Sequence, residues 1–227
     1  MKNTQTSESV FIGLTLAVSG GIMDVYSYLW RGKVFANAQT GNVLLFAISL
    51  ANGQFDSAAR YLLPIVAFVA GIALAEEVRY RRHERHLHWR QTTTASQIFI
   101  LFAVAFMGPE MNLFANSLTS FACGIQVEAF RKISGNGIAT TMCIGNLRSA
   151  TFNLMEYIHK KDRQNLKHVA LFYSAIGFFA LGGVAGSFAI PFMGQKTILL
   201  CCGLLTVVFI TMFIKTKENN LKGDIQP

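Results

Sequence analysis

The sequence predicts an all-α polytopic membrane protein with about six spanning helices and two re-entrant or broken segments, built as two inverted repeats. Hydrophobic residues make up 52% of the 227 residues and charged residues only 14%, whereas soluble domains contain about 25% charged residues. The mean hydropathy is +0.39, and a Gly-Asn pair recurs in two apolar segments. A large soluble helical protein would need polar helix faces, which most of these segments lack.

Six apolar segments approach the length that crosses a bilayer, which is about 20 mostly apolar residues in a helix. They cover residues 10–29, 61–78, 97–107 with its flanks, 113–130, 169–190 and 197–214. Two further apolar segments, 34–51 and 138–158, carry more polar residues. The cysteines lie inside apolar segments without metal-ligand spacing, so we expect them to be small buried hydrophobic side chains: Cys123, Cys143, Cys201 and Cys202.

The distribution of lysine and arginine favours six crossings over eight. If all eight segments crossed, the basic residues would divide almost evenly between the two sides of the membrane. If 34–51 and 138–158 instead enter and return on one side, sixteen basic residues lie on one side and four on the other, namely Arg31, Lys33, Arg60 and Lys196. Because basic loops stay in the cytoplasm, this count predicts that both termini are cytoplasmic. Eight membrane helices are the alternative.

A six-crossing chain would consist of two halves within a single transmembrane domain, residues 1–227. Repeat one covers 10–107 and repeat two covers 112–215, followed by a polar cytoplasmic tail at 216–227. Each half has three crossings, and because three is odd, the second copy must be inverted relative to the first. The re-entrant segments then enter from opposite faces. Irregular backbone at membrane depth must face protein or a water-lined cavity, so both tips should point inward.

Two long blocks of residues carry a resemblance to a known family. Residues 19–29 and 32–42 are similar to the first signature of the YoaK family of bacterial membrane proteins (DUF1275). Residues 124–132 and 139–148 resemble its second signature, except that Ile144 stands where the family usually has threonine. The resemblance implies about six membrane helices in a bacterial inner (plasma) membrane. It implies no activity, because the biochemical role of the family is uncharacterised.

Asp24 is the first candidate for a functional side chain, because it lies some fifteen residues into the first span. A carboxylate inside a membrane costs about 2.5–3.5 kcal/mol on insertion scales, so an unpaired one without a role is unexpected. One interpretation is a cation or proton site, or an ion pair with the other half. The other is a hydrated carboxylate near the interface and close to Arg31.

The two tips supply the other candidate substrate-binding residues. Glycine lets backbone approach closely, Asn and Thr offer hydrogen-bonding groups, and a helix that begins at a tip presents free N–H groups. Two such ends could bind a polar or anionic solute, although small and polar residues also pack helices together. The candidates are Asn37, Gln39, Thr40, Gly41 and Asn42 in the first tip and Thr140, Thr141, Gly145 and Asn146 in the second, with Gln126 lining a cavity.

Three other features have simpler interpretations. Arg148 could pair with Glu156, attract an anion or extend its charge to the membrane surface. The glycines of segment 182–186 suit close helix packing. The basic segment 79–90, which contains three histidines, is expected to contact anionic lipids, and Glu128 is expected to pair with Arg131.

These features favour a transporter or channel for an unidentified small solute, with the site at the interface of the repeats. The alternative is a structural or regulatory membrane protein in which the same motifs only pack helices. No catalytic triad, metal triad or cofactor motif is evident, so we expect neither an enzyme nor a bound cofactor. The expected partners are the lipid bilayer and the solute, without nucleic acid, and homo-oligomerisation is left open.

Overall fold

The computed structural model describes residues 9–81, 89–133, 136–138 and 140–223, and this part of the chain is almost wholly helical. The helices are α1 (Val10–Trp30), α2 (Gln39–Ala51), α3 (Phe55–Arg81), α4 (Trp89–Val104), α5 (Asn112–Ala129), α6 (Cys143–Lys160), α7 (Arg163–Met193) and α8 (Leu199–Gly223). Short 3₁₀ helices η2 (Pro109–Met111) and η3 (Gly194–Ile198) precede α5 and α8, and β1 (Lys132–Ile133) pairs antiparallel with β2 (Asn136–Gly137). The all-α class is therefore confirmed.

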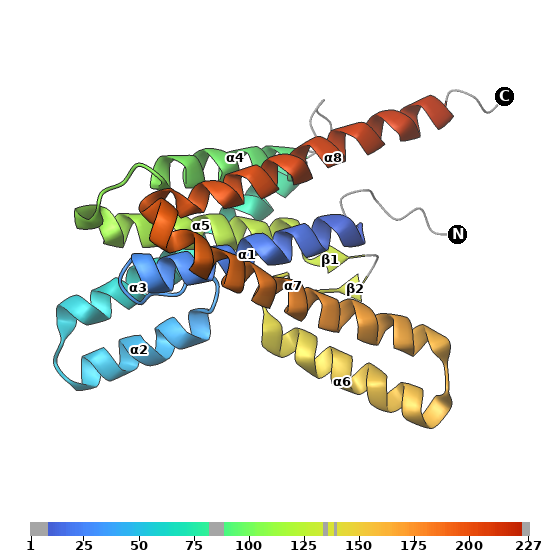
Figure 1. Cartoon of the computed structure of the whole chain (residues 1–227), viewed down its shortest axis with the longest axis horizontal. Helices are drawn as coiled ribbons and strands as arrows, with labels where there is room; N and C mark the ends of the chain where they lie inside the picture. Colours follow the sequence, from blue (N-terminus) through green and yellow to red (C-terminus); the bar gives the residue numbers. More distant parts are fainter. Residues whose placement is uncertain (1–8, 82–88, 134–135, 139, 224–227) are drawn as a thin grey trace.

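Two helices differ from the rest in their course through the molecule (Figure 1). Helices α1, α3, α4, α5, α7 and α8 follow its long axis, whereas α2 and α6 start near the middle and run to opposite ends. Helix α2 has 13 residues and α6 has 18, which at 1.5 Å per residue gives about 20 and 27 Å. The described chain before each helix is not helical, over 31–38 before α2 and at 138 and 140–142 before α6. These are the two segments expected to be re-entrant or broken.

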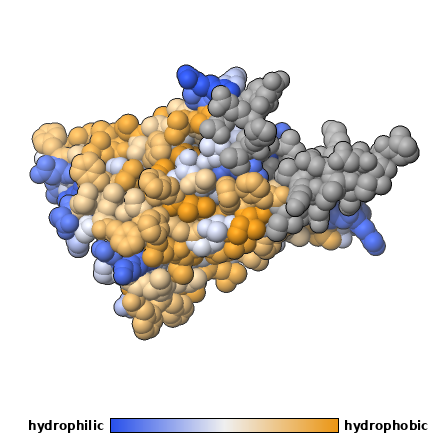
Figure 2. All heavy atoms as spheres, turned by 90° about the horizontal axis from the view of Figure 1, so that it is seen from above, coloured by the Kyte–Doolittle hydropathy of each residue, from blue (hydrophilic) through white to orange (hydrophobic). Residues whose placement is uncertain are grey.

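Length and composition identify three helical stretches in the described residues that could cross a membrane: Val10–Trp30, Phe55–Arg81 and Arg163–Phe213. The last contains both α7 and α8, which run in opposite directions on either side of η3 (Figure 1). Helix α8 continues to Gly223, so the first residues of the polar tail are helical. Figure 2 shows hydrophobic residues over most of the visible face and hydrophilic ones gathered toward its ends. The protein is a membrane protein; six spans stays a prediction.

The helix starts fall into two kinds. Helix α1 begins with Ser9, whose hydroxyl accepts a hydrogen bond from the N–H of Ile12 at 3.3 Å, and α7 begins with Asp162, which accepts from Gln164 at 2.9 Å. Such caps satisfy N–H groups that the first turn leaves free. No side chain caps α2 or α6 in this way. Helices α2 and α6 therefore begin without a side-chain cap, and in α2 the N–H groups of Gln39 and Gly41 bond to the carbonyls of Asn37 and Ala38.

The helices pack in pairs that join the two halves of the chain. Helix α1 packs along α7, and α3 packs along α5. Helix α2 rests on α3 and α6 rests on α7, while α4 contacts α5, α8 contacts α1, and α4 and α8 contact each other. Exchanging α1–α4 with α5–α8 in chain order reproduces this set of contacts.

Glycines allow both long pairs to approach to backbone contact. A Cβ added to Gly21 would lie 2.0 Å from the Phe179 carbonyl oxygen on α7, and one added to Gly182 would lie 2.1 Å from that of Val18. The α3–α5 crossing repeats the arrangement, because a Cβ on Gly124 would lie 2.1 Å from the Phe68 oxygen and one on Gly71 2.2 Å from the Phe121 oxygen. The expected packing role of segment 182–186 is confirmed at Gly182.

Arg31 fixes the end of α1 to the connection between α4 and α5. Its side chain is buried, and its guanidinium donates to the carbonyl oxygens of Val104 at 3.0 Å, Met107 at 2.8 Å and Gly108 at 3.1 Å. It also donates to the Tyr26 hydroxyl at 2.7 Å and to Asn112 Oδ1 at 3.1 Å. Carbonyls left free at the end of α4 thus receive a charged donor. Arg31 is therefore part of the protein core as well as a basic residue of the loop after α1.

Candidate functional site: a cavity between two helix tips

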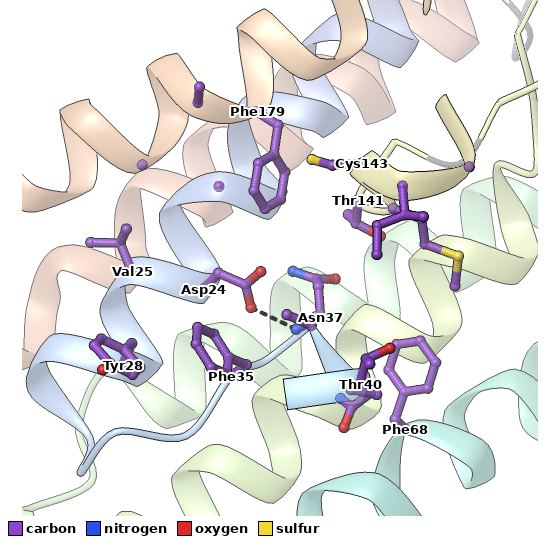
Figure 3. Close-up of a pocket in the computed structure, with 18 residues that line it drawn as sticks. Asp24, Val25, Tyr28, Phe35, Asn37, Thr40, Phe68, Thr141, Cys143 and Phe179 are labelled. Atoms are coloured by element: carbon purple, nitrogen blue, oxygen red, sulfur yellow. Dashed lines mark hydrogen bonds between the residues drawn. The ribbon is translucent and has the colours of Figure 1, made fainter. Parts of the chain in front are cut away.

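A cavity of about 640 Å³ lies where α2 and α6 begin. Its walls come from α1, α3 and α7 and from the first turns of α2 and α6 (Figure 3). Sites for small ligands typically measure about 300–1,000 Å³. The described residues that form it are Gly21, Asp24, Val25, Tyr28, Phe35, Asn37, Ala38, Gln39, Thr40, Phe68, Thr141, Met142, Cys143, Ile144, Gly145, Phe179, Ala180 and Gly183.

Asp24 holds the loop that leads into α2. One carboxylate oxygen accepts a hydrogen bond from the backbone N–H of Asn37 at 2.7 Å. Asp24 and Asn37 both line the cavity, side by side in Figure 3. Asp24 is 8% exposed, so its charge is stabilised mainly by backbone dipoles. The site retains lone pairs for a further donor.

The rest of the first tip serves largely to shape its own loop. Asn42 accepts from the Phe35 N–H at 3.0 Å and donates to the Phe35 carbonyl at 2.7 Å and to Gln39 Oε1 at 2.9 Å. Gln39 in turn donates to the Ala36 carbonyl at 2.8 Å. A Cβ on Gly41 would lie 2.9 Å from the Phe35 ring, so glycine makes room for that ring. Gly41 and Asn42 do not reach the cavity, whereas Thr40 does.

The second tip reaches the same cavity through residues 141–145. Thr141 is 6% exposed and Thr140 2% exposed, and the hydroxyl of neither has a hydrogen-bond partner among the described residues. Thr141 packs on α1, because a Cβ on Gly20 would lie 2.5 Å from its methyl group. Gly145 has open space around its Cα. The two tips therefore border one cavity, and of the two Gly-Asn pairs only Gly145 lines it.

Asn146 and Arg148 line a second cavity of about 580 Å³ between α6 and α7. Met142 and Gly145 belong to both cavities. The pairing of Arg148 with Glu156 that the sequence allows does not form, because Glu156 binds Lys160 one helical turn away. Arg148 shares its cavity with Asn153, His168 and Phe172.

Two further residues singled out in the sequence can be placed in the structure, and a third feature lies mostly outside the described residues. Gln126 lies in neither cavity; it is fully buried and donates to the Leu16 carbonyl at 3.2 Å, which ties α5 to α1. Glu128 pairs with Arg131 at 3.0 Å, as expected. Most of the basic segment 79–90 lies outside the described residues, so its contact with anionic lipids stays a prediction.

Aromatic residues form the part of the cavity that the sequence reasoning missed. Tyr28 and Phe35 stack with ring centroids 4.9 Å apart. Phe68 and Phe179 lie on other walls, at the two glycine crossings described above. In the sequence, Phe68 and Phe179 can be recognised by their position, because each stands three residues before a glycine that packs helices, Gly71 or Gly182.

Comparison with known proteins places the chain in a family. A family model described as "Protein of unknown function (DUF1275)" matches residues 12–211. The chain belongs to the DUF1275 family. A DUF1275 relative, the UPF0700 transmembrane protein YoaK of Bacillus subtilis (strain 168), is 27% identical over 187 residues, covering 78% of this chain and 81% of the relative. The resemblance inferred from the two signature blocks is thereby confirmed. No solved structure matches this DUF1275 protein.

Proposed function

We propose that this protein is a transporter or channel for a small solute, and that the solute binds in the cavity between the two tips. The observation that carries the proposal is that this cavity is bounded by Asp24 and by the first turns of α2 and α6. Buried carboxylates and non-helical backbone at membrane depth are typical of solute pathways. No catalytic chemistry forms part of the proposal.

The proposal includes an inverted repeat of α1–α4 and α5–α8. The exchangeable helix contacts support it, as do the two glycine crossings, in which each glycine faces the carbonyl of the residue three positions before its partner glycine. Figure 1 supports it too, because α2 and α6 extend toward opposite ends. In transporters with such repeats, the binding site lies where interrupted helices meet near the bilayer midplane.

The proposed location is the bacterial inner membrane with both termini cytoplasmic. Residues 54–58, at the start of α3, and residues 160–164, around the turn from α6 to α7, lie at opposite ends of the molecule (Figure 1). Single cysteines introduced there should react with an impermeant thiol reagent from opposite faces. Reaction of both segments from one face would refute the topology.

Transport is tested by filling the cavity at a position that has room. Gly145 lines it, and nothing lies within 4 Å of an added Cβ at Gly145 or at the control residue Gly177 on α7. In proteoliposomes, the wild type should accelerate uptake of at least one member of a panel of labelled polyols, amino acids, amines and carboxylates. Gly145→Trp should abolish that uptake, and Gly177→Trp should leave it unchanged.

The outcomes of this experiment separate the two functions that the sequence left open. Uptake no faster than in empty liposomes for every solute would reject transport. Equal effects of both tryptophan variants would reject the cavity as the route. The structural alternative is supported at one point, since every hydrogen bond of the Asn42 side chain stays within its own loop.

A further inference from the structure

We infer that the cavity between the tips selects an organic cation, a primary ammonium group attached to an apolar body. This inference rests on the proposed function and specifies its substrate class. Among the described residues that form the cavity, Asp24 carries the only charge. A ligand of opposite charge therefore meets a full negative charge in an apolar space, where electrostatic attraction is weakly screened.

Unpaired acceptors surround the charged group. The side-chain oxygen of Asn37 has no hydrogen-bond partner among the described residues, and neither has the hydroxyl of Thr141. Asn37 is 5% exposed and Thr141 6%, and both line the cavity, with Asn37 between Asp24 and Thr141 in Figure 3. A buried polar atom without a partner costs about 1–3 kcal/mol, so a ligand that satisfies these atoms gains that energy on binding.

The number of acceptors matches a primary ammonium group. Such a group has three N–H donors, and Asp24, Asn37 and Thr141 each offer an acceptor. The amide nitrogen of Asn37 is already used, because it donates to the Gly20 carbonyl at 3.2 Å. That bond fixes the orientation of the amide, and its oxygen is the atom without a hydrogen-bond partner among the described residues.

The remaining walls suit an apolar, cationic ligand. Tyr28, Phe35, Phe68 and Phe179 place four aromatic side chains around the cavity. Aromatic faces attract cations by about 0.5–2 kcal/mol and also cover apolar groups. A metal ion fits poorly, since Ca²⁺ takes 6–8 oxygen ligands and the described residues contain no group of three or more His, Cys, Asp or Glu side chains that could hold a metal.

An anion is disfavoured by the same geometry. The uncapped first turn of α6 presents about half a positive charge, but the carboxylate of Asp24 carries a full negative charge in the same cavity. The backbone N–H of Asn37 stabilises that carboxylate without neutralising it. The net potential at the ligand site therefore favours a cation.

The test compares three ligands of the same shape in the intact protein, reconstituted in nanodiscs of zwitterionic lipid. Isothermal titration calorimetry, with empty nanodiscs subtracted, measures binding of 2-phenylethylammonium, neutral 2-phenylethanol and anionic phenylacetate. We expect the amine to bind at least tenfold more tightly than the alcohol or the acid. Phenylacetate or the alcohol binding as tightly as the amine, or no binding of the amine, would overturn the inference.

Variants locate the binding. Asp24→Asn should weaken amine binding at least tenfold and Thr141→Val about threefold, whereas Asp56→Asn, an exposed carboxylate in the first turn of α3, should change nothing. A thermal transition will show whether the Asp24→Asn protein is folded. If it is not, the affinity of Thr141→Val and the ranking of the three ligands test the inference. Unchanged affinity in folded Asp24→Asn would refute the inference.

This inference and the transport proposal fail in different ways. Selective amine binding without uptake of any solute would leave the ligand class standing and remove transport. Uptake restricted to neutral or anionic solutes, blocked by Gly145→Trp, would uphold transport and remove the amine.

Discussion

The side chain of Asn42 binds both backbone groups of Phe35. Its amide oxygen accepts from the Phe35 N–H at 3.0 Å, and its amide nitrogen donates to the Phe35 carbonyl at 2.7 Å. This closed pair of bonds fixes the loop between α1 and α2 at the point where the chain turns back. The conspicuous Asn of the first Gly-Asn pair thus shapes the cavity from behind its wall.

Asn42→Ala should destabilise the protein by about 1–3 kcal/mol, because two partly buried backbone groups of Phe35 lose their partners at about 0.5–1.5 kcal/mol each. The thermal transition of purified protein measures the loss. Asn153→Ala is the matched control, since Asn153 makes one bond within its own helix, to the Ser149 carbonyl at 2.7 Å, and should change stability far less. A normal thermal transition with lost uptake would instead assign Asn42 to the solute.

Arg31→Lys should cost about 2–5 kcal/mol of stability. Lysine keeps the charge but cannot reproduce a planar fork that reaches several carbonyls at once, and the Met107 carbonyl then loses its donor. Arg60→Lys provides the control, because Arg60 is exposed and makes one bond, to Ser57 at 3.2 Å. Similar thermal transitions in both variants would show that Arg31 contributes only its charge.

Alanine at the glycine crossings should destabilise both of them alike. Gly21→Ala and Gly71→Ala each place a Cβ 2.0–2.2 Å from a carbonyl oxygen of the facing helix, which forces the helices apart at about 1–3 kcal/mol. Gly177→Ala meets open space and should be neutral or stabilising, since alanine favours helix by about 1 kcal/mol. A loss at one crossing with none at the other would contradict the equivalence of the halves.

Cys143 should be the cysteine that reacts with a water-soluble thiol reagent. It lines the cavity and is half-buried, whereas Cys123, Cys201 and Cys202 are buried. Mass spectrometry of labelled protein should therefore find one modified site, and Cys143→Ser should abolish the modification. Labelling that is absent from Cys143 in folded protein would show a cavity closed to water.

Much of the architecture follows from the sequence because hydropathy and charge are properties of segments. The interruptions before α2 and α6, and their approach to one cavity, follow from polar residues within apolar runs together with the uneven distribution of lysine and arginine. Close packing at Gly182 was predictable for a related reason, since small residues inside a spanning helix have few roles other than contact.

The site was less predictable, because its contacts join residues that are distant in the chain. Arg31 donates to carbonyls 73 to 77 residues away, whereas charge counting assigns Arg31 only to a loop. Gln126 looked like a cavity residue because it is polar in a span, yet it bonds to the Leu16 carbonyl 110 residues away. Phe68 and Phe179 give no polar signal at all, although they form walls of the cavity.

The pairing of helices divides the molecule into two blocks with a seam between them. One block contains α1, α7 and α6, and the other contains α5, α3 and α2, with the α4–α8 pair bridging them. The cavity lies on this seam, since Asp24, Thr141 and Phe179 belong to the first block and Thr40 and Phe68 to the second. Sliding or rocking of the blocks would widen or narrow the passage between the tips, while both glycine crossings, each internal to one block, stayed closed.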